Sequence, residues 1–87
     1  MSRLDVKHRI VRQLLVFANR YGKRDAHGHI VIQIRLTQGD LADLGGATRE
    51  RVNQVIGELR RADLIEIDSS NHITLRAPET LAHLTET

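Results

Sequence analysis

Two short helical patterns meet at a pair of glycines, Gly45 and Gly46, and this junction constrains the fold more than any other feature of the sequence. The segment before it opens with Thr37-Gln38-Gly39-Asp40, which has the spacing of a capping box with Asp in place of Glu. The apolar side of this first helix consists of Leu41, Ala42 and Leu44. The two glycines end the helix and allow a tight turn.

The second pattern begins at Thr48, whose hydroxyl can accept a hydrogen bond from an unpaired amide of the first helical turn. Its inner stripe is Val52, Val55, Ile56 and Leu59, extended by Ala62 and Leu64. The opposite face carries Arg49, Glu50, Asn53, Gln54 and Gly57. We predict a helix over residues 48–63. Two short helices joined by a glycine turn are typical of a helix-turn-helix motif.

The flanking segments complete a winged version of this motif. Apolar residues at three- and four-residue steps, starting at Leu4, predict an amphipathic helix to Tyr21, with Phe17 and Tyr21 on its inner side. Gly22 ends this helix, residues 23–28 form a polar loop, and alternating isoleucines predict a strand over residues 29–36. Two further strands, residues 64–67 and 72–75, flank a turn-rich segment, and Pro78 opens a last helix to Leu84.

The predicted fold class is therefore α+β. It is a small winged helix-turn-helix domain with an N-terminal helix, a strand, the two motif helices, a β-hairpin wing and a short C-terminal helix. Its 87 residues suffice for one domain, residues 1–87, with one modest core. Cysteine is absent, and no apolar run approaches the length of about 18 residues that a membrane span needs. We expect a cytoplasmic protein that does not enter a membrane.

Charge is unevenly distributed along the chain. The net charge is only +2, but residues 1–24 contain seven basic residues and one acidic residue, a net of +6. Such a basic third permits a polyanionic partner without requiring one. The exposed face of the second motif helix is more informative, because arginine can donate a bidentate pair to guanine, glutamate can accept from the cytosine amino group, and glutamine can pair with adenine.

The run LTQGDLADLGGATRERVNQVIGELRRADLIEI, followed by a hairpin, resembles the DNA-binding domain of the Crp/Fnr family of transcription regulators. The resemblance extends from about Val6 to Leu84. It implies sequence-specific binding to double-stranded DNA, with the recognition helix of residues 48–63 in the major groove. Transcription regulation, rather than catalysis, is the expected function.

Individual site residues follow from the same resemblance. It implies that Arg49 and Glu50 contact bases, and Gln54 stands where family members carry a second base-reading arginine. The expected phosphate contacts are Thr37, Thr48, Arg51, Asn53, Ser70 and Asn71. Gly39 stands where a glutamine can contact phosphate, so we expect that contact to be lost, and the wing lacks a lysine often found there. Arg60 and Arg61 are further candidates for phosphate contacts, but they lie far along the helix, which favours a solvated role or an ion pair within the chain.

The resemblance also has implications for the whole protein. Full-length family members carry an N-terminal effector-binding domain and a dimerisation helix, so we expect this chain to be a C-terminal domain. The full protein would be a homodimer on a near-palindromic site, whereas this chain alone would be a monomer. No cofactor is expected in this domain. A loop that meets RNA polymerase in the family would correspond to Lys23, Arg24, Asp25 and His27.

Other functions have weaker support in the residues. The five histidines have no cysteine or close carboxylate pair beside them, so no metal site is predicted. No serine or threonine lies in a nucleophile motif, so no enzyme is predicted. The main alternative is a winged helix that contacts a protein, such as RNA polymerase or another regulator, without specific DNA binding. That version predicts a neutral or acidic second helix with exposed apolar residues, and this alternative remains open.

Overall fold

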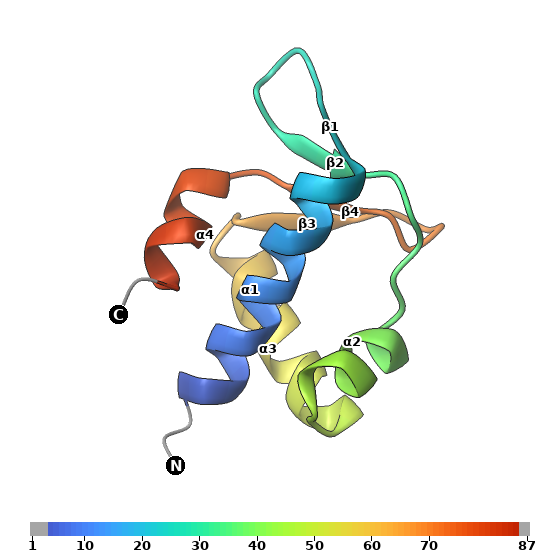
Figure 1. Ribbon diagram of the computed structural model, residues 1–87, viewed down its shortest axis with the longest axis vertical. Coiled ribbons are helices and arrows are strands. Elements are labelled where there is room, and N and C mark those ends of the chain that lie inside the picture. Colours follow the sequence, from blue (N-terminus) through green and yellow to red (C-terminus); the bar gives the residue numbers. More distant parts are fainter. Residues whose placement is uncertain (1–3, 86–87) are drawn as a thin grey trace.

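The structure, a computed structural model, describes residues 4–85, with side chains from Val6 onward. Leu4, expected to begin the apolar stripe of the first helix, therefore has a side chain outside the described part. Figure 1 shows the arrangement of the elements. In chain order they are α1 (Leu4–Tyr21), β1 (Gly22–Arg24), β2 (Ile30–Ile32), α2 (Gln38–Gly45), α3 (Arg49–Arg61), β3 (Ile65–Ile67), β4 (Ile73–Leu75) and α4 (Pro78–Leu84). The predicted α+β winged helix-turn-helix architecture is confirmed.

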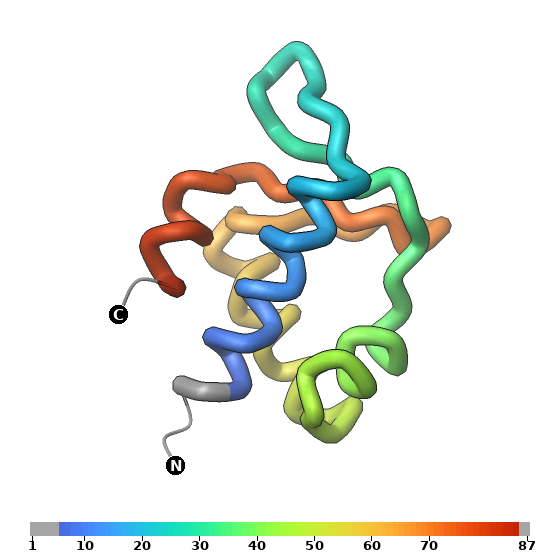
Figure 2. The backbone as a smooth tube through the Cα atoms, in the orientation of Figure 1, coloured from blue at the N-terminus to red at the C-terminus, as the bar shows by residue number. Residues whose placement is uncertain are grey.

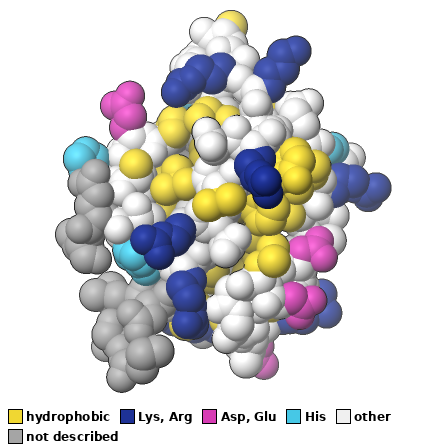
Figure 3. All heavy atoms as spheres, viewed as in Figure 1, with side chains coloured by type: hydrophobic (Ala, Val, Ile, Leu, Met, Phe, Trp, Pro, Cys, Tyr) yellow, Lys and Arg dark blue, Asp and Glu magenta, His cyan; other side chains and the backbone are white. Residues whose placement is uncertain are grey.

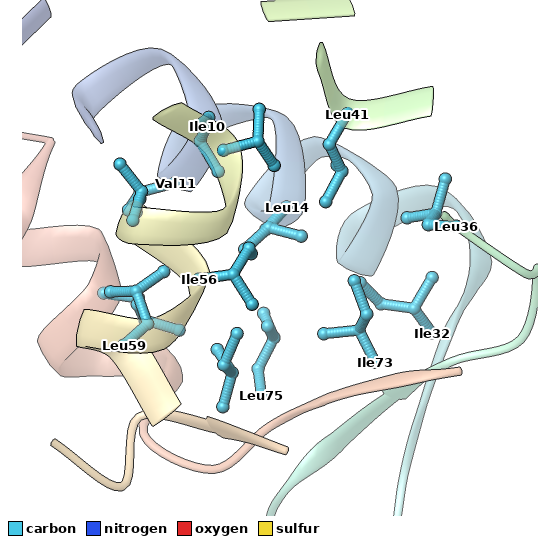
Figure 4. Packing of buried hydrophobic residues seen from close by; sticks show 14 of the residues in the cluster. Ile10, Val11, Leu14, Ile32, Leu36, Leu41, Ile56, Leu59, Ile73 and Leu75 are labelled. Carbon is cyan, nitrogen blue, oxygen red and sulfur yellow. The ribbon is translucent and has the colours of Figure 1, made fainter. Parts of the chain in front are cut away.

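One core joins the helices to the sheet. Every element except β1 contributes at least one buried hydrophobic side chain, and no polar or charged residue in the described part of the chain is buried. Figure 4 shows side chains of α1, α2 and α3 meeting those of β2 and β4. The buried residues of α3 are those of the predicted inner stripe, Val52, Val55, Ile56 and Leu59. Burial of this stripe fixes which face of α3 points outward.

The sheet contains a strand that the sequence did not predict. Its order is β1-β2-β4-β3, with antiparallel neighbours throughout. The prediction of a polar loop over residues 23–28 is wrong at its start, because Gly22–Arg24 form β1 and pair with β2. Gly22 makes this direct change from helix to strand possible. A Cβ at this position would lie 2.1 Å from the carbonyl oxygen of Ala18, closer than any side chain tolerates.

The predicted strand over residues 29–36 is shorter than expected. Only Ile30–Ile32 pair as β2, and the chain then leaves the sheet to reach α2. Leu36 is nevertheless buried, and Ile34 packs against the core. The alternation of apolar residues therefore reflects alternate burial beyond the last strand pairing, and Figure 2 shows this segment descending beside the tip of the β3–β4 wing.

Three apolar side chains differ from the predicted pattern. Leu44 is 50% exposed and Tyr21 is 41% exposed, although both were assigned to inner faces. Leu44 lies outside the buried residues of α2, which are Leu41, Ala42 and Gly45, and Tyr21 is the last residue of α1. Tyr21 instead stacks on Phe17, with 6.2 Å between ring centroids. Ala62 is also exposed, because α3 ends at Arg61 and Ala62 forms its C-cap.

The two motif helices begin as the sequence predicts, and α2 also ends at the predicted glycines, whereas α3 ends at Arg61, two residues before the predicted end at residue 63. The Thr37 hydroxyl accepts from the Asp40 amide at 3.1 Å, and the Thr37 amide donates to the Asp40 carboxylate at 3.0 Å, which confirms the capping box. Gly46 adopts a left-handed conformation, φ 63°, directly after α2, as expected for a glycine at a helix end. The Thr48 hydroxyl accepts from the Arg51 amide at 3.1 Å, which confirms Thr48 as the N-cap of α3.

Candidate nucleic-acid interface

The outer face of α3 carries the candidate base-reading residues. Arg49, Glu50 and Gln54 are all exposed in the first half of the helix, and Asn53 is exposed beside them. Because the opposite stripe of α3 is fully buried, this face cannot rotate out of position without opening the core. The arrangement offers guanidinium donors, a carboxylate acceptor and an amide, the groups that can hydrogen-bond to base edges.

Arg51 and Gln54 are in direct contact, which the sequence reasoning missed. The Arg51 Nη1 donates to the Gln54 Oε1 at 2.8 Å. The sequence analysis gave these residues separate roles, one as a phosphate contact and one as a base reader. Their spacing of three positions on a helix places them on neighbouring turns, and this spacing was the signal that could have indicated the pair.

Arg49 lies against the start of α2, beside Gly39. The position that a Cβ of Gly39 would occupy is 3.7 Å from Arg49 Nε and 3.8 Å from Arg49 Cζ. The same position is 3.7 Å from the Thr37 hydroxyl oxygen. The sequence predicts that glycine at this position loses a phosphate contact. The structure adds that Arg49 of α3 lies near the first turn of α2, where a Cβ at position 39 would be in ordinary van der Waals contact with its guanidinium.

A polar hollow of about 410 Å³ separates the wing from the two motif helices. Its polar lining consists of Thr37, the N-cap of α2, Gln38 from α2, Arg49 and Arg60 from the two ends of α3, and Asp68 and Asn71 from the wing. The hollow therefore brings together three predicted DNA contacts, Thr37, Arg49 and Asn71. It also includes Arg60, for which the sequence favoured a solvated or paired role over a phosphate contact. Arg49 and Arg60 are eleven positions apart, about three helical turns, so they share one face.

The wing is held against the segment that leads into α2. The Arg35 Nε donates to the carbonyl oxygen of Ser70 at 3.2 Å, and the Leu36 amide donates to that of Asn71 at 3.0 Å. Within the turn, the Asp68 carboxylate accepts from the amides of Ser70 and His72, each at 2.9 Å. The His72 amide is the main cause that lowers the pKa of Asp68. The two predicted wing contacts, Ser70 and Asn71, thus lie in an ordered turn.

The residues assigned to a polymerase-contact loop lie elsewhere. Lys23 and Arg24 belong to β1, and Asp25 and His27 lie in the turn that follows. This hairpin is at the opposite end of the molecule from α2 and the start of α3 (Figure 1). The Asp25 carboxylate accepts from the amide of His27 at 2.8 Å and from that of His29 at 3.0 Å. The structure therefore separates this loop from the candidate DNA-binding residues.

Exposed apolar residues do not gather on the outer face of α3. The large exposed hydrophobic residues in the described part of the chain are Val16, Tyr21 and Leu44, on α1 and α2. Figure 3 shows hydrophobic side chains together with basic ones on the face that includes α1. Among residues 4–85, no group of three or more His, Asp or Glu side chains is placed to hold a metal ion. The polar outer face of α3 is therefore suited to binding a polar partner.

Comparison with known proteins identifies the family of this chain. The sequence model of the Crp-like helix-turn-helix domain matches residues 8–84. The chain belongs to this family. The match covers both motif helices, the wing and most of α1, so the resemblance inferred from the residues is confirmed. Membership of the Crp-like family makes this a DNA-binding domain of the transcription-regulator class.

Individual relatives agree with the family. The chain is 41% identical over 68 residues to the anaerobic regulatory protein of Bacillus subtilis, which covers 78% of this chain and 28% of that protein. It is 33% identical over 67 residues to the CRP-like cAMP-activated global transcriptional regulator of Mycobacterium tuberculosis, and the match covers 77% of this chain and 30% of that protein. A crystal structure of a CRP/FNR-family transcriptional regulator from Thermus thermophilus superposes with a TM-score of 0.78 at 30% sequence identity, over 93% of this chain and 40% of that one.

These relatives are regulators, and the chain spans about a third of their length. No helix in the part of the chain that the structure describes is long and apolar enough to cross a membrane. The family match and the structural similarity therefore establish the fold, the family and the DNA-binding class.

Proposed function

We propose that this Crp-like domain binds a specific double-stranded DNA sequence by placing the first half of α3 in the major groove. The observation that supports this most directly is the contrast between the two faces of α3. One face is buried through Val52, Val55, Ile56 and Leu59, and the other exposes Arg49, Glu50 and Gln54. A helix held this firmly, with donors and acceptors on its free face, matches the docking geometry of helix-turn-helix recognition.

In this proposal the exposed residues of α3 read base edges. Arg49 donates a bidentate pair to guanine O6 and N7, and Glu50 accepts from the amino group of a cytosine. Gln54, on the next turn, adjusts the preference at a neighbouring base pair. Glu50 favours specificity in particular, because a carboxylate near phosphates is unfavourable unless a cytosine amino group meets it.

The surrounding polar residues hold the DNA backbone in register. Thr37, Arg49 and Asn71 all line the hollow between α2 and the wing. Thr48, Arg51, Asn53 and Ser70 complete the proposed phosphate contacts. Arg60 joins this set because it lines the same hollow. Such contacts position the protein without carrying sequence information.

The whole protein is proposed to act as a dimeric transcription regulator. An effector would bind a domain outside this chain and reposition two copies of this one on a near-palindromic site, with recognition helices about 34 Å apart. This domain itself would need no cofactor and perform no catalysis. Alone it would be a monomer with DNA affinity near the nonspecific range of roughly 10⁻⁴ to 10⁻⁶ M. We place the protein in the cytoplasm and assign Lys23, Arg24, Asp25 and His27 to a contact with RNA polymerase.

The test is selection from a random duplex library by the complete chain joined to a dimerising helix. Binding of the selected site and of random DNA is then compared at two salt concentrations. The expected result is a two-fold site with G·C pairs in each half and a specific affinity that exceeds the random one at both salts. A folded protein that enriches no sequence would instead support the protein-contact function and direct attention to the β1–β2 hairpin.

A further inference from the structure

The bond between Arg51 and Gln54 determines how the glutamine amide is oriented. The Arg51 Nη1 is 2.8 Å from the Gln54 Oε1. A guanidinium has only N–H donors and no acceptor, so it can hold the amide only by its oxygen. The amide nitrogen of Gln54, with its two N–H donors, therefore faces away from Arg51.

The backbone keeps Arg51 in place for this contact. Its amide donates to the Thr48 hydroxyl at 3.1 Å, which fixes the residue in the first turn of α3. Arg51 is half-buried, whereas Gln54 is exposed. The arginine is thus the supported member of the pair and the glutamine is the member that reaches outward.

This orientation changes what Gln54 can read. A glutamine acting alone favours adenine, because its oxygen accepts from adenine N6 while its nitrogen donates to N7. In this chain one lone pair of the oxygen is engaged by a cation, and the end of the amide that faces away from Arg51 is the nitrogen, with its two donors. Guanine presents two acceptors, O6 and N7, where adenine presents one acceptor and an amino group. The pair therefore favours guanine over adenine.

We propose that Arg51 is a specificity-determining residue that acts through Gln54, and that together they select guanine over adenine at the base pair that Gln54 faces. The inference rests on the proposed DNA binding and extends it to one base pair. A guanidinium has five N–H donors, so Arg51 can hold Gln54 and still contact a phosphate. The two roles differ in their readout, because a phosphate contact affects all sequences alike and a positioning contact affects one base pair.

The experiment compares the wild-type chain with Gln54→Ala, Arg51→Ala and the double variant in the same library selection. The base pair whose preference disappears in Gln54→Ala is the one that Gln54 reads. At that pair we expect the wild type to prefer guanine over adenine, and Arg51→Ala to reduce this preference by roughly fivefold or more. In the Gln54→Ala background, the additional loss of Arg51 should leave the preference at that pair unchanged.

Arg61→Ala is the matched control, because it removes one exposed positive charge from the same helix away from Gln54. It should leave the base preference as in the wild type. An adenine preference in the wild type, or an Arg51→Ala variant that weakens every sequence equally, would overturn the inference while leaving the proposed DNA binding intact. If the wild type selects no site at all, the proposed function and this inference fail together. Circular dichroism of each variant establishes that it is folded.

Discussion

The two motif helices begin in the same way and then differ in chemistry. Each has a threonine N-cap whose hydroxyl accepts from the amide three positions later. In α2 the next three residues are Gln-Gly-Asp, and the Asp40 carboxylate accepts a hydrogen bond from the Thr37 amide. In α3 they are Arg-Glu-Arg, and the third residue, Arg51, extends its side chain to Gln54 instead.

This difference gives the two helices different roles. We call α2 the supporting helix, because its first polar groups bind one another, and α3 the presenting helix, because it exposes its polar side chains. The carboxylate of Asp40 closes the first turn of α2 on itself, so its polar groups bind one another. The first turn of α3 carries two arginines and a glutamate, and Arg49 and Glu50 are exposed. The backbone geometry of the two caps is nearly the same, with Thr37 at φ −84° and Thr48 at φ −76°. Side-chain chemistry, rather than backbone shape, therefore distinguishes the two helices.

The largest expected effect comes from loosening α3 on the core. Ile56 is 1% exposed, so Ile56→Ala removes buried methyl groups and leaves a cavity. We expect a loss of about 2–5 kcal/mol in the free energy of unfolding. Urea denaturation followed by circular dichroism measures it. Gln54→Ala, an exposed change on the same helix, is the control and should leave the urea midpoint within error. A small loss for Ile56→Ala would mean that α3 is not firmly seated.

Next in size is the loss of a base contact from the presenting helix. Arg49→Ala should weaken binding to the selected site by on the order of 1–3 kcal/mol and relax the preference at one base pair. Fluorescence anisotropy with the selected site and with random DNA measures both affinities. Arg12→Ala removes an exposed charge from α1 and should not change the ratio between the two DNAs. If Arg49→Ala lowers both affinities by the same factor, Arg49 is a phosphate contact.

A smaller effect should distinguish the two caps. Removing the hydroxyl of an N-cap threonine lowers stability by about 0.5–2 kcal/mol. We expect Thr37→Ala to be the more damaging of the two, because it also removes the hydrogen bond of the Thr37 side chain to the Asp40 carboxylate, which keeps only the backbone amide of residue 37, whereas Thr48 has no carboxylate partner in a capping box. Thermal melts of Thr37→Ala and Thr48→Ala test this, with serine at each position as the control that keeps the hydroxyl. Equal losses would show that the hydrogen bond between the Thr37 side chain and the Asp40 carboxylate adds nothing to the cap.

The smallest effect is a pH dependence confined to α2. Hydrogen bonds from the Thr37 amide and then from its side chain lower the pKa of Asp40 below its ordinary value of 3.8. A carboxylate with a lowered pKa stabilises the fold at neutral pH, and this contribution disappears as the pH falls through the folded-state pKa. Asp40→Asn should therefore lower the melting temperature slightly at neutral pH and progressively less in acid below about pH 4. Asp43→Asn lies outside the capping box on the same helix, and its difference in melting temperature from the wild type should not shrink in acid in this way.

Most of the fold could be predicted because its signals are local. The caps at Thr37 and Thr48, the turn at Gly46 and the inner stripe of α3 depend on residues within a few positions of one another. Strand β1 could not be predicted in the same way. Its three residues are exposed and polar, and they form a strand only because Gly22 permits a sharp turn and β2 supplies a partner.

In the candidate interface, too, the features that depend on local sequence could be predicted and those that depend on the tertiary fold could not. The exposure of Arg49, Glu50 and Gln54 followed from the helical period alone. The approach of Arg49 to Gly39 could not be predicted, because it depends on how α2 and α3 cross. The position of Arg60 in a hollow shared with the wing depends on the fold of the β3–β4 hairpin. The spacing of Arg51 and Gln54 in the sequence makes their hydrogen bond possible. Helical spacing alone, however, does not determine whether the arginine side chain extends into solvent or pairs with the glutamine.

The order of the sheet has a consequence for how this domain folds. β2 pairs with β4 through Ile30 and Leu75, and both motif helices lie in the chain between these strands. The helices can form from local contacts, but their mutual placement is complete only when this long loop closes. We therefore expect refolding experiments to show helical signal before the ability to bind DNA. In kinetic terms, the strand pairing at the centre of the sheet would be the late event that makes the recognition surface.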